Sequence, residues 1–167
     1  MGFTLDPEVA VALAPMAEAM ADTVPPPVGD VGSRRPVLET IMAQTAALQS
    51  MPTDVKITDF HTAADDGTAI LLRWYVKEGA AAGPAVLYLH GGGMISGNVD
   101  VYDGPVSRYV SNSGVSMLAA DYRLAPEHPY PVPVEDCYAG LSWLVEHTSE
   151  LGVDPARIAV MGVSLLN

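Results

Sequence analysis

The chain has 167 residues, 49% of them hydrophobic, which supplies enough material for a buried core. Its formal net charge of −12 argues against a nucleic acid or an anionic membrane surface as a partner, because the field of the protein repels a polyanion. The chain does not open on a basic segment followed by an apolar run, and no apolar run approaches the ~20 residues of a membrane span, so we expect a soluble, cytoplasmic protein.

Two helices are expected at the start of the chain. Asp6 followed by Pro7 is typical of an N-cap and a first helical residue, and apolar residues then recur at helical spacing as far as Met20. Pro15 is expected to kink or divide this helix.

The proline-rich and glycine-rich segment 21–36 predicts a loop. A second amphipathic helix follows, and its predicted apolar face comprises Leu38, Ile41, Met42, Thr45 and Leu48. Such methionine-rich faces fit a cap over a pocket and plain packing on a core equally well.

Two strands joined by a tight turn are expected next, at 55–61 and 68–76. The connection contains Asp66 followed by Gly67, which is a strong signal for a β-hairpin. The sheet is therefore predicted to open with an antiparallel pair.

Three short and nearly continuous apolar runs follow, at 85–90, 115–122 and 157–162. Such runs are typical of strands that are buried on both faces. The helix-length segments between them, including 133–147, predict parallel strands joined by right-handed crossovers, so the fold class is α/β with a mostly parallel sheet. The single cysteine, Cys137, is expected to be a buried packing residue in a reducing compartment rather than a nucleophile.

The first apolar run leads into the motif His90-Gly91-Gly92-Gly93. Consecutive glycines let the backbone turn sharply and present N–H groups to a developing negative charge, as in an oxyanion hole. The alternative interpretations are a plain tight turn and a phosphate cradle, although no lysine of the Walker type follows.

The last apolar run leads into a second motif, Gly162-Val163-Ser164. It is the first half of G-x-S-x-G, a strained turn from strand to helix that exposes the serine hydroxyl. Both motifs follow buried strands, and in open α/β sheets ligands bind beyond the carboxyl ends of the strands. The two motifs are therefore predicted to share one site.

Together with the stretch DYRLAPEHPYP at 121–131, these motifs resemble the hormone-sensitive-lipase-type (HGGG) carboxylesterase family of the α/β-hydrolase fold. The order of the motifs and the intervals between them match this family throughout residues 55–164. The resemblance implies an N-terminal helical cap at 1–52. It also implies that 53–167 is the N-terminal portion of the catalytic domain, truncated at the nucleophile turn.

The resemblance further implies a role for each motif residue. Ser164 would attack an ester carbonyl as the nucleophile. The backbone N–H groups of Gly92, Gly93 and Leu165 would bind the oxyanion. His90 and Gly91 would support this loop rather than transfer protons.

The acid and the base of the catalytic triad are expected to be absent from this chain. The resemblance makes Asp121 a structural acid, and neither His61 nor His128 lies where the family places its base. The histidines and the cysteine show no spacing typical of metal ligands, so no metal is predicted, and no cofactor is implied.

The chain departs from the family directly after the serine. The family continues with alanine and two glycines, whereas this chain continues with Leu165, Leu166 and Asn167. Leu166 replaces a glycine, and its side chain is expected to clash with neighbouring backbone. Without a base the serine is not activated, so we expect an inactive truncated form. An alternative explanation is that these three residues mark an artefactual boundary.

The leading hypothesis is therefore a parent activity of serine carboxylesterase on short acyl esters. The alternatives are amide or carbamate hydrolysis by the same machinery and a non-catalytic ligand-binding protein of the same fold. The expected partners are a small-molecule ester and either a second copy of the chain or a complementing C-terminal fragment, because half a sheet exposes an unpaired strand edge.

Overall fold

The computed structural model describes residues 4–20, 24 and 26–164. Residues 1–34 and 35–167 form two separate compact units. In the first unit, α1 (Pro7–Met20) begins where the sequence predicts, and Asp6 caps it by accepting a hydrogen bond from the Glu8 N–H at 2.9 Å. The helix continues through Pro15 without being divided. The predicted division into a cap at 1–52 and a catalytic portion at 53–167 concerns the roles of the two segments rather than their compactness, and it stays a prediction.

Helix α2 (Val31–Ala47) begins inside the segment for which the sequence predicts a loop. The carboxylate of Asp30 accepts a hydrogen bond from the Ser33 N–H at 3.1 Å and so caps the helix, and Pro36 is accommodated inside it. The predicted apolar face is also wrong at one residue, because Leu48 lies beyond the end of the helix and is 88% exposed.

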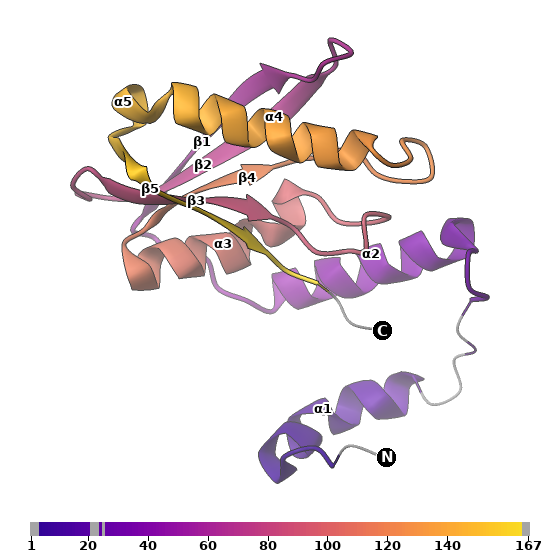
Figure 1. Ribbon diagram of the computed structural model, residues 1–167. Coiled ribbons are helices and arrows are strands. Elements are labelled where there is room, and N and C mark those ends of the chain that lie inside the picture. The colour runs from indigo at the N-terminus through magenta and orange to yellow at the C-terminus, as the bar shows by residue number, and fades with distance from the viewer. Residues whose placement is uncertain (1–3, 21–23, 25, 165–167) are drawn as a thin grey trace. The chain divides into compact units, whose positions relative to one another are not determined.

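The second unit is built on one five-stranded sheet with the strand order β1-β2-β4-β3-β5 (Figure 1). The strands are β1 (Val55–Ala63), β2 (Ala69–Lys77), β3 (Gly83–Leu89), β4 (Ser116–Ala120) and β5 (Val153–Gly162). β1 and β2 form the predicted antiparallel hairpin, and β2 also runs antiparallel to β4. β3 pairs parallel with both β4 and β5, so the predicted parallel portion is confirmed.

The hairpin turn lies where the sequence predicts it. Gly67 adopts a φ of +81°, a backbone conformation that glycine enters without a steric penalty. Its N–H donates a hydrogen bond to the Ala64 carbonyl at 2.8 Å. The turn therefore sets the register of the two strands it joins.

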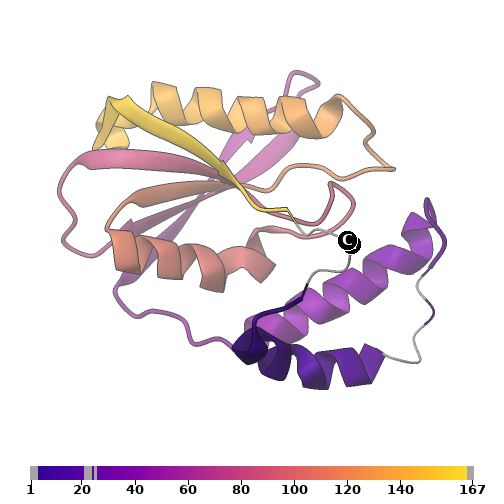
Figure 2. The ribbon, with the colours of Figure 1, turned by 60° about the horizontal axis from the view of Figure 1, so that its bottom comes forward.

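Helices α3 (Val99–Ser113) and α4 (Val132–Glu146) cover opposite faces of the sheet (Figure 2). Since successive side chains of a strand point to opposite faces, each strand contributes to two cores. The core on the α4 side contains Leu72, Leu87, Leu118, Trp143 and Leu144. The core on the α3 side contains Tyr75, Tyr88, Val106, Val110 and Met117. A single helical turn, α5 (Thr148–Leu151), connects α4 to β5.

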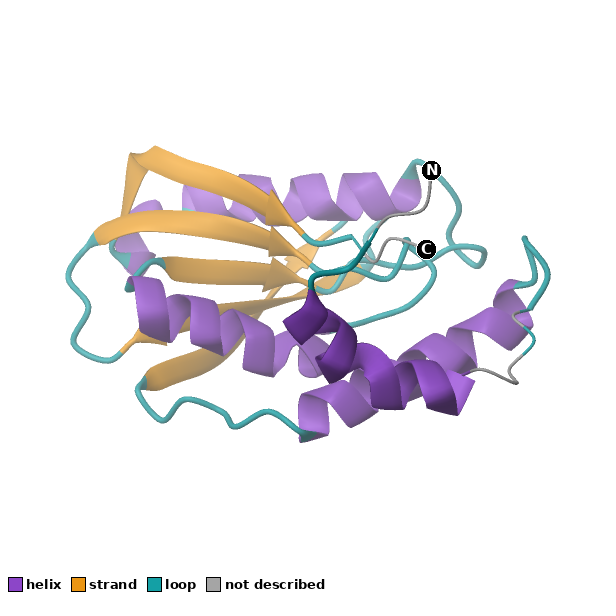
Figure 3. Ribbon diagram, turned by 90° about the horizontal axis from the view of Figure 1, so that it is seen from below, coloured by secondary structure: helices purple, strands orange, loops and turns teal. Residues whose placement is uncertain are grey.

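Strand β5 is the least covered strand of the parallel group. Among the described residues it pairs with β3 alone, and the side chain of Val160 is 55% exposed. β3, β4 and β5 all end at the same edge of the sheet, where loops gather (Figure 3). That edge carries both predicted motifs.

Candidate active site

The two predicted motifs lie next to each other at the carboxyl edge of the sheet. β3 and β5 are parallel neighbours, and Leu89 is the register partner of Gly162, so the segments that follow these two residues leave the sheet side by side. Between them is an open cavity of about 370 Å³. Its lining includes His90, Gly91, Gly93, Tyr122, Cys137 and Ser164.

His90 is fixed in place by its neighbours. Its ring is stacked on that of Tyr122, with centroids 4.1 Å apart and planes 8° apart, and the Tyr122 hydroxyl donates a hydrogen bond to the His90 carbonyl at 2.6 Å. His90 Nδ1 lies 3.0 Å from the Gly91 carbonyl, which can only accept, so this nitrogen carries the proton. Burial lowers the pKa of His90, which favours the neutral ring.

Two carbonyl groups of the glycine loop are held by hydrogen bonds. The Gly91 carbonyl accepts from His90, and the Gly92 carbonyl accepts from the Ile95 N–H at 3.1 Å, the Ser96 N–H at 3.2 Å and the Ser96 hydroxyl at 3.1 Å. A peptide unit is planar, so fixing a carbonyl also fixes the N–H of the next residue, which points the opposite way. The Gly92 and Gly93 N–H groups are thereby oriented, and neither donates to another described residue.

Glycine is required at two positions of this loop because other atoms approach too closely for a side chain. A Cβ at Gly91 would lie 2.8 Å from the Tyr102 hydroxyl and 2.9 Å from the Val163 carbonyl. A Cβ at Gly92, where φ is +130°, would lie 2.0 Å from the Ser96 carbonyl oxygen. Because Gly91 has no side chain, Val163 of the second motif can lie close to the backbone of the first motif.

Ser164 is exposed and lines the cavity. The Val163 N–H donates a hydrogen bond to the Leu89 carbonyl at 3.2 Å, which holds the segment beside β3. The Ser164 hydroxyl makes no hydrogen bond to another described residue. Of the described histidines, His90 lines this cavity, whereas His61 and His128 do not. Leu165, the third predicted oxyanion donor, and Leu166, the predicted source of a clash, lie outside the described residues.

Cys137 has a different place from the one the sequence predicts. It is half-buried rather than buried, and it lines the same cavity as Ser164. Burial raises the pKa of its thiol to about 11, so the thiolate is scarce at neutral pH. This position does not contradict the prediction from the sequence that Cys137 is not a nucleophile.

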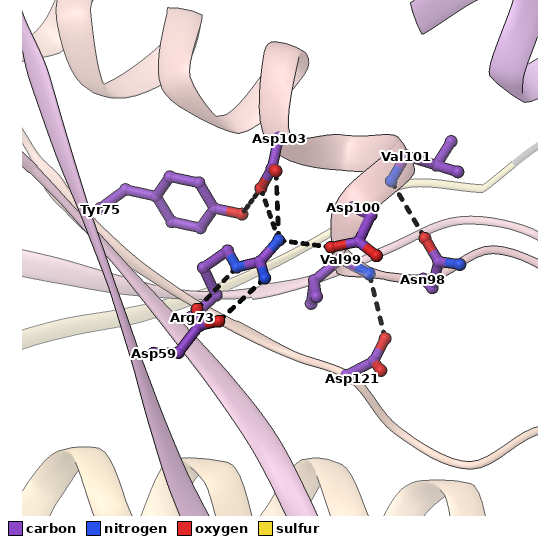
Figure 4. A network of polar contacts seen from close by, with 9 residues as sticks. All are labelled: Asp59, Arg73, Tyr75, Asn98, Val99, Asp100, Val101, Asp103 and Asp121. Atoms are coloured by element: carbon purple, nitrogen blue, oxygen red, sulfur yellow. Dashed lines mark hydrogen bonds and ion pairs between the residues drawn. The ribbon is translucent and has the colours of Figure 1, made fainter.

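Asp121 acts on the helix that follows the glycine loop (Figure 4). Its carboxylate accepts a hydrogen bond from the Val99 N–H at 3.0 Å, and the Asn98 side chain accepts one from the Val101 N–H at 3.0 Å. Both bonds satisfy free N–H groups at the start of α3. Asp121 therefore has a structural contact, as the resemblance implies.

A second network in Figure 4 fastens the same end of α3 to the sheet. Arg73 on β2 contacts Asp59 at 2.7 Å, Asp100 at 2.6 Å and Asp103 at 3.1 Å. The Tyr75 hydroxyl donates a further hydrogen bond to Asp103 at 2.6 Å. These contacts hold the first turns of α3, which also carry Tyr102, the residue beside Gly91.

The loop that begins at Asp121 is anchored by a buried ion pair that the sequence does not predict. Arg123 donates to both oxygens of the fully buried Asp136 on α4, with Nη2 at 2.7 Å from one and Nε at 2.8 Å from the other. This pair holds the segment that presents Tyr122 to His90. The sequence does contain a signal that Asp136 is buried, because Asp136 shares a helical face with the buried residues Pro133 and Gly140.

Within the described residues no helix is long and apolar enough to cross a membrane.

Comparisons with known proteins agree with this geometry. Residues 86–165 match a family described as having the alpha/beta hydrolase fold. Esterase LipI of Mycobacterium tuberculosis is 45% identical over 84 residues, which are 50% of this chain and 26% of LipI. The ethyl acetate hydrolase of Pseudomonas putida is 38% identical over 112 residues, 65% of this chain and 35% of that protein. The solved structure of a hyperthermophilic esterase from Pyrobaculum calidifontis is similar with a TM-score of 0.78 at 32% identity, covering 96% of this chain and 50% of that one. The aligned part is half or less of the length of each of these proteins.

Proposed function

The chain belongs to the hormone-sensitive-lipase type of α/β-hydrolase, and on this premise we propose that it carries the nucleophile and the oxyanion hole of a serine carboxylesterase. Ser164 attacks the carbonyl carbon of an ester and forms an acyl-enzyme. The backbone N–H groups of Gly92, Gly93 and Leu165 bind the oxygen that becomes negative in that step. The observation that supports this proposal is that Ser164 and the glycine loop line one cavity.

The glycine loop is suited to an oxyanion because its donors are oriented before the substrate binds. Hydrogen bonds to the Gly91 and Gly92 carbonyls hold the two following N–H groups in fixed directions. Preorganised donors of this kind need no rearrangement as charge develops, and losing one costs roughly 10²–10³-fold in kcat. His90 acts here through the Gly91 carbonyl, as a support for the loop.

Among the described residues no side chain is placed to act as the base for Ser164. His90 shares the cavity, but its Nδ1 is bonded to the Gly91 carbonyl and its Nε2 is buried without a partner. A serine without a base is a weak nucleophile. We therefore propose that this chain alone acylates slowly and releases the acyl group more slowly still, so that turnover is low.

The proposed substrates are small esters with short acyl groups. The cavity of about 370 Å³ is near the lower end of the roughly 300–1,000 Å³ of small-molecule sites. Its lining includes the apolar side chains of Leu89, Met94 and Val163, which suit a short hydrocarbon chain.

The test is covalent labelling of the wild-type chain and of Ser164→Ala with p-nitrophenyl butyrate at mildly alkaline pH, followed by intact mass and peptide mapping. We expect one butyryl group on Ser164 in the wild type, none at that peptide in the variant, and p-nitrophenol release that stops near one equivalent. Equal labelling of both proteins would contradict the role of Ser164. Repeated Ser164-dependent turnover would show that a base is present after all.

The same experiment separates the alternatives. Saturable binding of the ester without acylation favours a ligand-binding protein of this fold. Acylation by a p-nitroanilide at a rate comparable to that by the ester favours amide hydrolysis.

A further inference from the structure

Arg35 connects helix α2 to two loops that are distant in the sequence. Its Nε donates a hydrogen bond to the Ile95 carbonyl at 2.6 Å, and its Nη2 donates to the Ala125 carbonyl at 2.7 Å. The two terminal nitrogens also contact the two oxygens of Glu127, at 2.9 Å and 2.7 Å. One planar guanidinium group thus holds two carbonyl groups and one carboxylate at once, which is the geometry that arginine provides and lysine does not.

The two carbonyl acceptors of Arg35 belong to the support of the glycine loop. Ile95, whose carbonyl binds Arg35, donates its own N–H to the Gly92 carbonyl at 3.1 Å. Ala125, whose carbonyl also binds Arg35, donates its N–H to the Met94 carbonyl at 2.8 Å. Arg35 therefore closes a ring of hydrogen bonds around the turn that follows Gly93. The orientation of the Gly93 N–H depends on this turn, because the N–H shares a peptide plane with the Gly92 carbonyl.

Apolar packing supplies little of the anchorage of α2 within the second unit. Met42 is the one described residue of this helix that is buried. A groove of about 170 Å³ remains between α2 and α3, with Ile41 and Val101 on its two sides. Since the helix buries so few side chains there, the polar contacts of Arg35 carry much of its attachment.

We infer that Arg35 is a positioning residue that holds the proposed oxyanion loop from helix α2. The inference rests on the proposed function of Gly92 and Gly93, while the ring of hydrogen bonds can be tested without it. Loss of Arg35 removes the donor of the Ile95 and Ala125 carbonyls together and frees the turn between Gly93 and Ser96.

The pH range of this contact follows from Glu127. Its hydrogen bond with Arg35 lowers the pKa of its carboxyl to about 2. The folded value is below the ordinary one of about 4.3, so the stabilisation is present above that ordinary value and is lost as the pH falls through about 2. The contact is therefore intact at neutral and at mildly alkaline pH.

The test compares amide hydrogen exchange in Arg35→Met and in the wild type, read by NMR at single residues. The informative amides are those of Ile95, Ser96 and Ala125, whose N–H groups close the ring. We expect Arg35→Met to speed their exchange at least about tenfold and to leave the amides of β3 and β4 unchanged. A purely structural role would speed exchange throughout the second unit by one common factor, and that result would overturn the inference.

The matched control is Arg34→Met, which makes the same chemical change one residue earlier. Arg34 donates to the Pro26 carbonyl at 2.7 Å rather than to either loop, so its variant should exchange like the wild type.

Arg35→Lys keeps the charge and should recover only part of the protection. Glu127→Gln should have a smaller effect than Arg35→Met, because Arg35 keeps both carbonyl acceptors. Equal effects of Arg34→Met and Arg35→Met would also overturn the inference.

A second readout connects the inference to the proposed chemistry. If the wild type acylates at Ser164, Arg35→Met should slow that acylation on the order of tenfold, as a small misplacement of oriented groups does. Arg34→Met should not slow it. If the wild type does not acylate, the proposed function fails while the exchange measurement still decides the role of Arg35. Acylation that stays at the wild-type rate in Arg35→Met would contradict the positioning role.

Discussion

The two segments that meet in the proposed site are held in very different ways. The glycine loop is enclosed: His90 is stacked on Tyr122, the Gly92 carbonyl accepts three hydrogen bonds, and a Cβ at Gly91 or Gly92 would collide with its neighbours. Ser164 is exposed at the end of the edge strand β5 and has no such enclosure among the described residues. The glycine loop is therefore held by many contacts, whereas Ser164, among the described residues, is held mainly by the strand that carries it.

The largest expected effect is at Gly92. A methyl group there would have to adopt a φ of +130° and would meet the Ser96 carbonyl oxygen at 2.0 Å. Strain of about 1–3 kcal/mol and overpacking of about 1–3 kcal/mol act together. We therefore expect Gly92→Ala to lower the free energy of unfolding by about 4 kcal/mol, measured by urea denaturation.

Gly67→Ala is the matched control for that substitution. Gly67 has a φ of +81°, but no atom lies within 4 Å of the place that a methyl group would take, so its variant reports the backbone strain alone, about 1–2 kcal/mol. A loss at Gly92 no larger than the loss at Gly67 would show that the loop relaxes easily and is not enclosed as described.

The next largest effect concerns two ion pairs, one in the support of the glycine loop and one in the first half of β5. Arg123→Met leaves the buried Asp136 carboxylate without its charged partner, although the backbone N–H of residue 123 still donates to it, and we expect a loss of about 3 kcal/mol in the free energy of unfolding. Arg157→Met on β5 removes an exposed pair with Asp154, for which less than about 1 kcal/mol is expected. Denaturation of the two variants under one buffer condition gives the comparison. Equal losses would mean that β5 is held as firmly as the support of the glycine loop.

Much of the fold could be predicted from the sequence because its signals are local. Asp66 and Gly67 specify a tight turn from adjacent residues, and each buried strand is a short apolar run bounded by turn residues. The wrong prediction at the start of α2 has a local cause as well. The prolines of 21–36 favour a loop, although Asp30 supplies a cap to the residues that follow it.

The supports of the site could not be predicted in the same way, because they join residues far apart in the sequence. Arg35 and Glu127 are separated by 92 positions, and nothing adjacent to either residue specifies the other. Asp136 is closer to being predictable, since a carboxylate on the buried face of a helix requires a partner. The position of Cys137 in the cavity depends on which strands are neighbours and follows from no local pattern.

The smallest effect is expected at Gly162, the glycine of the serine motif. A Cβ there meets no described atom within 4 Å, and φ is not in the left-handed region. Glycine in a strand is destabilising relative to alanine by roughly 0.5–1 kcal/mol, so Gly162→Ala should leave the free energy of unfolding unchanged or raise it by up to about that amount. A loss above about 1 kcal/mol would show that the serine turn is packed as closely as the glycine loop, and it would remove the contrast between the two sides of the site. A small effect on stability together with a loss of Ser164 labelling would instead locate the requirement for glycine in the substrate's approach to the serine.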